Sequence, residues 1–233
     1  MTSIRIRFSK EGKVRFVSHR DVARLFERAI RKLRFPVAYS EGFSPRPKVS
    51  FGLALSVGHE SDAEYLDVRL DGPVDLEVLP AQMTAALPVG ITVHGVEPLD
   101  AGAPSLQQAV VCCDWQIEVI GLSAAELTSV VSDVIAAPEV QIERERKGKS
   151  TVADVRPAIL HLEVVGPTDD GVQLAATLAT DLVSLRPNEL VGLLSPDLVE
   201  GRVRRTHQWM IVDGARCEPI PGLSTGPLLE RAS

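Results

Sequence analysis

The sequence has 233 residues, of which 45% are apolar and 24% are charged, so it can form a globular core without disulfide or metal cross-links. It has no run of 18 apolar residues and no apolar stretch near its N-terminus, which argues against a membrane helix and a signal peptide and predicts a cytoplasmic protein. The net charge of −6 is uneven, because residues 1–50 hold 13 of the 25 Lys and Arg residues but only 4 of the 31 acidic residues. Such a basic block favours a polyanion-binding face, or a segment that neutralises the acidic part internally.

The first hundred residues predict the element order β–α–β–β–α–β. Apolar and polar residues alternate over 4–8, which indicates a half-buried strand, and a second short strand is expected at 14–16. Ser18, with Asp21 three residues later, marks the start of a helix over 18–34 whose apolar residues recur on one face. The remaining elements are strands and one weaker helix, expected at 49–53, 65–70, 79–87 and 91–96. This order is typical of a ferredoxin-like fold.

The second half repeats this rhythm after a linker at 100–108. Its strands and helices are expected at 110–120, 124–136, 140–146, 158–165, 172–179, 186–194 and 203–212. We therefore predict an α+β protein with two ferredoxin-like (βαββαβ-type) sandwich domains in tandem, at 1–99 and 109–213. A tail at 214–233, rich in Gly, Pro and Ser, is expected to be flexible.

The segment 39–52, YSEGFSPRPKVSFG, is more particular than a surface loop requires. Two prolines fix the backbone on both sides of Arg46, so this arginine would lose little entropy on binding a phosphate or a carboxylate. The candidate ligand-binding residues are this basic pair, two aromatic rings that could stack on a base, and one hydroxyl: Arg46, Lys48, Tyr39, Phe43 and Ser40. The alternative is a rigid crossover whose aromatics fill the core and whose Arg46 pairs with an acid.

The predicted helix carries a basic stripe opposite its apolar face, formed by Arg20, Arg24, Arg28 and Arg31. Stripes of one sign track phosphate groups, although such a face can also serve solubility alone. His19 lies at the helix N-terminus, where the dipole disfavours its charged form, so it is either a neutral base or a partly exposed first-turn residue. We expect the loop to line a cleft at this end of the helix, with Arg46 and Lys48 beside His19 and Arg20.

A second basic element lies at 144–157, in the predicted turn between the strands at 140–146 and 158–165, and contributes Lys147, Lys149 and Arg156. It could contact a nucleic-acid backbone, or it could be basic without a function. A third basic cluster, RVRRTHQ at 202–208, falls on a predicted strand. The three cysteines lack the spacing of a zinc or iron–sulfur site, and no phosphate-binding glycine loop or hydrolase motif is present. We therefore expect no metal and no cofactor in this chain.

Three segments together resemble the N-terminal signature of an uncharacterised bacterial family linked to radical-SAM proteins. They are SHxDxxRxxxRA at 18–29, YSxGFxPRPKxSFG at 39–52 and GxxSxxEYxD at 58–67. Ser44 stands where asparagine is usual, and KGKSTVADVRPAI at 147–159 is similar to a later motif of the family. The resemblance implies a separate radical-SAM partner. That partner would hold the iron–sulfur cluster and S-adenosylmethionine, since this chain lacks the cluster cysteines.

These features favour a non-catalytic RNA- or polyanion-binding accessory protein that works with the radical-SAM partner in RNA modification or processing. One alternative is an enzyme acting on an anionic or RNA substrate, with His19 as general base, Glu64 assisting, and Arg46 and Lys48 holding the substrate. The other alternative is a docking module that binds the radical-SAM protein through the same basic face.

Overall fold

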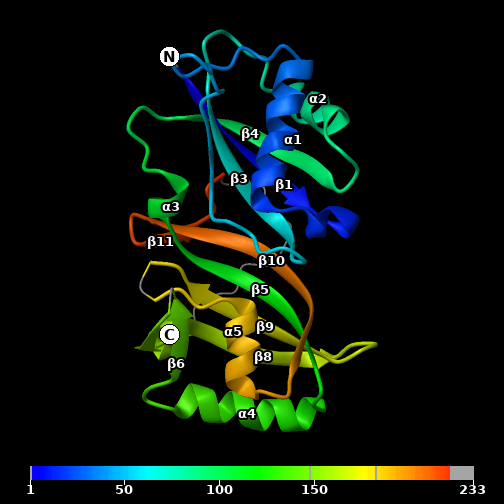
Figure 1. Cartoon of the computed structure of the whole chain (residues 1–233), viewed down its shortest axis with the longest axis vertical. Coiled ribbons are helices and arrows are strands. Elements are labelled where there is room, and N and C mark those ends of the chain that lie inside the picture. The colour runs from blue at the N-terminus through cyan, green and yellow to red at the C-terminus, as the bar shows by residue number, and fades with distance from the viewer. Residues whose placement is uncertain (1, 147, 182, 221–233) are drawn as a thin grey trace.

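The computed structural model describes residues 2–146, 148–181 and 183–220, which form a mixed α+β body (Figure 1). Its main-sheet strands are β1 (Ser3–Lys10), β2 (Val49–Phe51), β3 (Glu60–Arg69), β4 (Ile91–Leu99), β5 (Val110–Ile120), β8 (Ile159–Pro167), β9 (Val172–Ala179), β10 (Val199–Val212) and β11 (Ala215–Cys217). The other elements are a separate hairpin, five helices and two 3₁₀ turns: β6 (Gln141–Arg146), β7 (Lys149–Asp154), α1 (His19–Lys32), α2 (Leu79–Ala86), α3 (Leu106–Ala109), α4 (Ala124–Ala136), α5 (Pro187–Leu194), η1 (Gly12–Phe16) and η2 (Arg156–Ala158). Within the described residues, no helix is long and apolar enough to cross a membrane.

Helix α1 forms where the sequence predicts it. The Ser18 hydroxyl accepts the backbone N–H of Asp21 and so caps the first turn. The apolar face is buried, and the ring of Phe26 packs 4.7 Å from that of Phe8 on β1, measured between ring centroids. The helix ends where Arg34 adopts a left-handed conformation, with a φ of 48°. Because the apolar face is used in the core, the arginine face is left to solvent.

The two halves of the chain have the same strand order. In the first half, β4-β1-β3-β2 are antiparallel neighbours, and in the second half β10-β5-β9-β8 are antiparallel neighbours. Each half has its own apolar core between the sheet and its helices. In the second half, α4 forms where the sequence predicts a helix over 124–136, and a capping box of Ser123 and Glu126 starts it.

One sheet runs through both halves because β3 pairs with β10 in parallel, through Glu60 with Arg204 and Ser61 with Arg205. β1 occupies the other edge of β3, so β2 and β10 share the remaining edge. The main sheet of the described residues therefore has nine strands, in the order β4-β1-β3-β10-β5-β9-β8 with β2 and β11 beside it (Figure 1). The division into two tandem ferredoxin-like domains stays a prediction, since the halves share this sheet.

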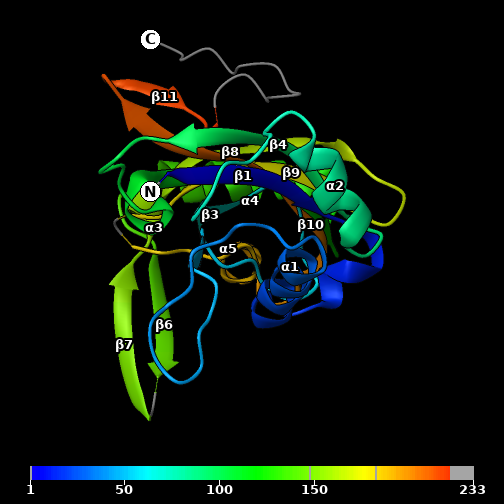
Figure 2. The ribbon, with the colours of Figure 1, turned by 90° about the horizontal axis from the view of Figure 1, so that it is seen from above.

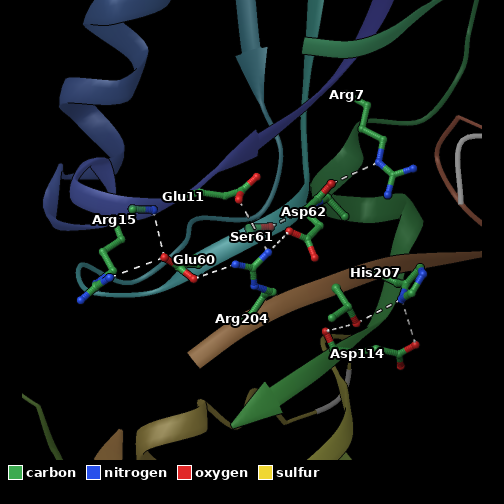
Figure 3. Close-up of polar contacts among 12 residues, drawn as sticks. Arg7, Glu11, Arg15, Glu60, Ser61, Asp62, Asp114, Arg204 and His207 are labelled. Carbon is green, nitrogen blue, oxygen red and sulfur yellow. Dashed lines mark hydrogen bonds and ion pairs between the residues drawn. The ribbon is translucent and has the colours of Figure 1, made fainter. Parts of the chain in front are cut away.

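Charged side chains hold the seam between β3 and β10. Arg204 contacts Glu60 at 2.9 Å and Asp62 at 2.6 Å, and Arg15 lies 3.5 Å from Glu60 (Figure 3). Burial alone would raise the pKa of Glu60, but hydrogen bonds from the Gly12 N–H and from Arg204 hold this pKa below its ordinary value. Part of the third basic cluster of the sequence is therefore used inside the fold, as a partner of acids in the first half.

Four segments differ from the sequence prediction, and one of them is the expected turn between 146 and 158, which contains the strand β7. The expected strand at 14–16 is the 3₁₀ turn η1, and the expected linker contains α3, which buries Leu106. The segment expected to be a flexible tail begins with β11, which pairs with β10, and continues to the buried Glu218 and Ile220. Burial of these residues is the physical reason for the correction, and 221–233 lie outside the described residues.

The two sides of the sheet carry different elements. Figure 2 shows α1, α5, the loop between α1 and β2, and the β6–β7 hairpin on one side, with β11 on the other. We call the first side the helical face. The loop comes from the first half of the chain and the hairpin from the second, and both project from this face.

Candidate nucleic-acid interface

The loop between α1 and β2 folds back on itself as a narrow hairpin. Tyr39 and Pro47 form a β-bridge, the Ser40 N–H donates to the Arg46 carbonyl (2.8 Å), and the Arg46 N–H donates to the Ser40 hydroxyl (3.0 Å). The Ser40 side chain therefore shapes the loop. Tyr39, Phe43 and Arg46 are exposed, and Phe43 is completely so. The alternative reading of the loop expected its aromatic rings to fill the core, but both rings lie at the surface.

A groove of about 440 Å³ separates this loop from α1. It is lined by Arg20, Ala23, Arg24, Glu27, Arg31, Tyr39, Ser44, Pro45, Arg46 and Pro47. We call it the arginine groove, because four of its ten residues are arginines and one is acidic. An anion that enters it meets guanidinium groups from both walls, which a single exposed helix face could not provide.

Most of this positive charge is available to a ligand. Arg24 contacts Asp21 at 2.7 Å, and Arg31 contacts Glu27 at 3.4 Å, but both pairs are exposed and such pairs are weak. Among the described residues, no carboxylate lies within 4.0 Å of the guanidinium of Arg20 or Arg46. The alternative role of Arg46, as the ion-pair partner of an acid, is therefore not seen in the part of the chain that the structure describes.

Arg28 faces a second hollow on the same helix. This hollow has a volume of about 580 Å³ and is lined by Val17, Asp21, Arg24, Leu25, Glu27, Arg28 and Arg31. Since Arg24 and Arg31 line both hollows, the basic surface continues around the helix from the loop side to Arg28. All four arginines of the predicted stripe therefore belong to one continuous basic surface.

The predicted cleft differs from the groove in the structure in its position and in two of its residues. The arginine groove extends along α1 from Arg20 to Arg31, and neither His19 nor Lys48 lines it. His19 instead packs edge-on against Phe51, with ring centroids 5.5 Å apart, while Lys48 is exposed on the strand-like return of the loop. His19 is thus turned to β2, and neither residue contributes to the arginine groove.

Partial burial of His19 makes the stability of the fold depend on pH. Burial lowers the pKa of His19 below 6.5, and burial likewise lowers that of His94. The unfolded chain then binds more protons between the lowered pKa and 6.5, so stability is fully present above that window and falls as the pH falls through it.

We expect the free energy of unfolding to decrease between about pH 7.5 and pH 5, and to decrease less in His19→Gln. Urea titrations of both proteins at the two pH values measure this difference. An identical decrease in the variant would mean that His19 is protonated equally easily in both states.

Glu64 does not act as a free acid in this structure. It is buried and forms an ion pair with Arg205, whose Nε lies 3.1 Å and whose Nη2 lies 2.5 Å from the Glu64 carboxylate. Arg205 also donates to the carbonyl of Leu53 at 2.9 Å. Sequence reasoning missed this pair, because Arg205 sits in a basic cluster that looks exposed; the alternation along β10, with Val203 buried, was the available signal.

The second basic element is not part of the arginine groove. Arg156 donates to the carbonyls of Ile159 (3.1 Å) and Ile135 (2.9 Å), so it braces α4 and η2 instead of reaching outward. Lys147 and the side chain of Lys149 lie outside the described residues. Nor do the described residues include a group of three or more His, Cys, Asp or Glu side chains that could hold a metal ion.

The family model described as an uncharacterized protein conserved in bacteria (DUF2344) matches residues 3–187, from β1 to the start of α5. The chain belongs to this family. The matched part of this DUF2344 protein contains the arginine groove and the loop, and its family description names no radical-SAM protein. None of the curated proteins matches the sequence.

One solved structure shares the fold of this DUF2344 protein, and a second is similar to a lesser degree. A chain in the crystal structure of a Cbf5-Nop10-Gar1 complex is similar with a TM-score of 0.51 and 10% identity, over 88% of this chain and 48% of that one. A chain in the structure of an H/ACA RNP bound to a substrate RNA containing 2'-deoxyuridine gives a TM-score of 0.44 and 10% identity, over 89% and 47%. The DUF2344 protein thus spans about half the length of these chains, and the likeness concerns the fold alone.

Proposed function

We propose that this DUF2344 protein is a non-catalytic RNA-binding protein that holds the phosphate backbone in the arginine groove. The observation that carries the proposal is the convergence of Arg20, Arg24 and Arg31 from α1 with Arg46 from the loop on one groove. Guanidinium groups form bidentate hydrogen bonds with phosphate oxygens, and several on one groove follow successive phosphates.

The loop suits an RNA better than a folded acidic protein. Pro45 and Pro47 restrain the backbone beside Arg46, and the tip is closed by the Ser40 hydrogen bonds, so little order must be gained on binding. Tyr39 in the groove and Phe43 at the tip offer exposed rings on which unpaired bases stack. Rings beside guanidinium groups match the succession of bases and phosphates along a single RNA strand.

The proposal extends to the partner and to the architecture. The motif resemblance supports a separate radical-SAM protein as the partner, which would bring the iron–sulfur cluster and S-adenosylmethionine to an RNA held by this chain. The equal strand orders support two ferredoxin-like units, at 1–99 and 109–213, fused through β3 and β10. In this arrangement the first unit supplies the arginine groove.

Binding of a fluorescent twelve-nucleotide oligouridylate, followed by anisotropy at several salt concentrations, tests the proposal. We expect affinity to fall steeply between about 50 and 200 mM salt, because bound counterions are released from each neutralised phosphate. In Arg46→Ala, affinity should fall about tenfold and the salt slope by about 1, with the melting temperature unchanged because Arg46 is exposed.

Arg216→Ala is the matched control, since Arg216 is an exposed arginine on β11, on the opposite side of the sheet (Figure 2). It should bind as the wild type does. If the wild-type protein bound no RNA, yet co-purified with a radical-SAM protein after nuclease treatment, the basic face would be a protein-docking surface and the RNA proposal would be wrong.

A further inference from the structure

A second pocket opens on the helical face, where the two halves meet. It has a volume of about 200 Å³ and is lined by Leu53, Ala54, Ser56, Cys113, Trp115, Leu178, Ala179, Thr180, Ser184, Leu185, Arg186, Pro187 and Arg205. These residues come from the segment after β2, from β5, β9 and β10, and from the start of α5. Because α5 forms one wall, the pocket lies on the same side of the sheet as α1 and the loop (Figure 2).

The deep part of the pocket is lined by the aromatic ring of Trp115 and by Arg205, whose charge is neutralised by Glu64. The Arg205 guanidinium lies 5.4 Å from the centroid of the Trp115 ring, and Glu64 compensates its charge. Burial raises the pKa of Cys113 to about 12, so its side chain is an uncharged thiol. With a neutral floor and mostly apolar walls, this pocket does not suit a phosphate.

The guanidinium of Arg205 at this depth is already bonded within the protein. Arg205 is 2% exposed, and its Nε and Nη2 are occupied by Glu64 and by the Leu53 carbonyl. Arg205 also forms a side-chain hydrogen bond with the Cys113 thiol. The floor therefore offers a ligand an uncharged surface whose polar groups are already paired. At the rim, the exposed Arg186 adds a cation outside the apolar part.

We propose that this pocket accepts one unpaired nucleobase of the RNA. Drug-sized ligands need pockets of about 300–1,000 Å³, so a pocket of about 200 Å³ suits a single heterocycle. An uncharged planar ring fits the Trp115 ring and the apolar walls, while Arg186 meets the adjoining phosphate. The inference rests on the proposed RNA binding and adds base recognition to it.

The test compares two twelve-nucleotide strands, oligouridylate and the same ribose–phosphate backbone with every base absent. Ala54 is exposed and lines the pocket, so the variant Ala54→Phe fills the pocket with a large side chain. The control is Ala54→Ser, which keeps the side chain small and the pocket open. We expect the wild type and Ala54→Ser to prefer oligouridylate, and Ala54→Phe to lose about tenfold of that preference. The abasic strand should bind equally to all three proteins, since the arginine groove is unchanged.

The two proposals fail differently in this experiment. If Ala54→Phe bound oligouridylate as tightly as Ala54→Ser does, the pocket would hold no base, while RNA binding through the arginine groove would stand. If neither strand bound to the wild type, the proposed function itself would be wrong. A circular-dichroism melt of each variant verifies that a change in binding is not a loss of folding.

Discussion

Replacing Arg205 by methionine is expected to lower the free energy of unfolding by about 3–5 kcal/mol, the effect of leaving a buried charge without its partner. Arg205 is 2% exposed and its ion pair with Glu64 lies beside the seam between β3 and β10. Without the guanidinium, the Glu64 carboxylate stays buried with its opposite charge removed, and the Leu53 carbonyl loses its donor. The loss therefore exceeds that of the packing alone.

Urea denaturation followed by circular dichroism measures this effect. The control Arg202→Ala removes an exposed arginine from the same strand and should change stability by less than about 0.5 kcal/mol. The double variant Arg205→Met, Glu64→Leu should recover much of the loss, because neither charge is then buried. A loss below about 1 kcal/mol in Arg205→Met would show that the pair is solvated and not structural.

The second large effect concerns binding. The triple variant Arg20→Ala, Arg24→Ala, Arg46→Ala should weaken oligouridylate binding by at least about 100-fold, because three charge-assisted contacts to phosphate are lost from both walls of the groove. Its melting temperature should stay close to that of the wild type, since all three side chains are exposed.

The matched control for charge is a second triple variant, Arg69→Ala, Arg202→Ala, Arg216→Ala, which removes three exposed arginines outside the groove. Both triple variants have the same net charge. If they weakened binding equally, general attraction between protein and RNA would explain it, and the groove would not be the site.

The sequence predicts local features of this fold well because their signals are local. The Ser18 cap, the apolar stripe of α1 and the helix over 124–136 each depend on residues that are close in the sequence, and each is present in the structure. The β–α–β–β–α–β order of the elements in the first half follows for the same reason. The pairing of β3 with β10 does not, because it joins residues more than a hundred positions apart and involves only two residue pairs.

Part of the candidate site was predictable for the same reason. The proline-framed Arg46 and the arginine stripe could be found from spacing, and they meet in one groove. His19 and Lys48 could not be excluded from it, because their position depends on how the loop returns to β2. Arg156 was wrongly predicted to bind a ligand, because its hydrogen bonds to backbone carbonyls inside the fold cannot be recognised from the sequence.

Ultraviolet crosslinking of the tagged protein in bacterial cells, followed by identification of the crosslinked peptides and of all bound RNA and protein, tests the central claim most directly. The account predicts RNA joined to the peptide that contains Tyr39 and Phe43 and to peptides of α1, since the exposed rings of the loop lie beside the arginine groove. Crosslinks from these peptides to protein alone, with no RNA recovered, would contradict it.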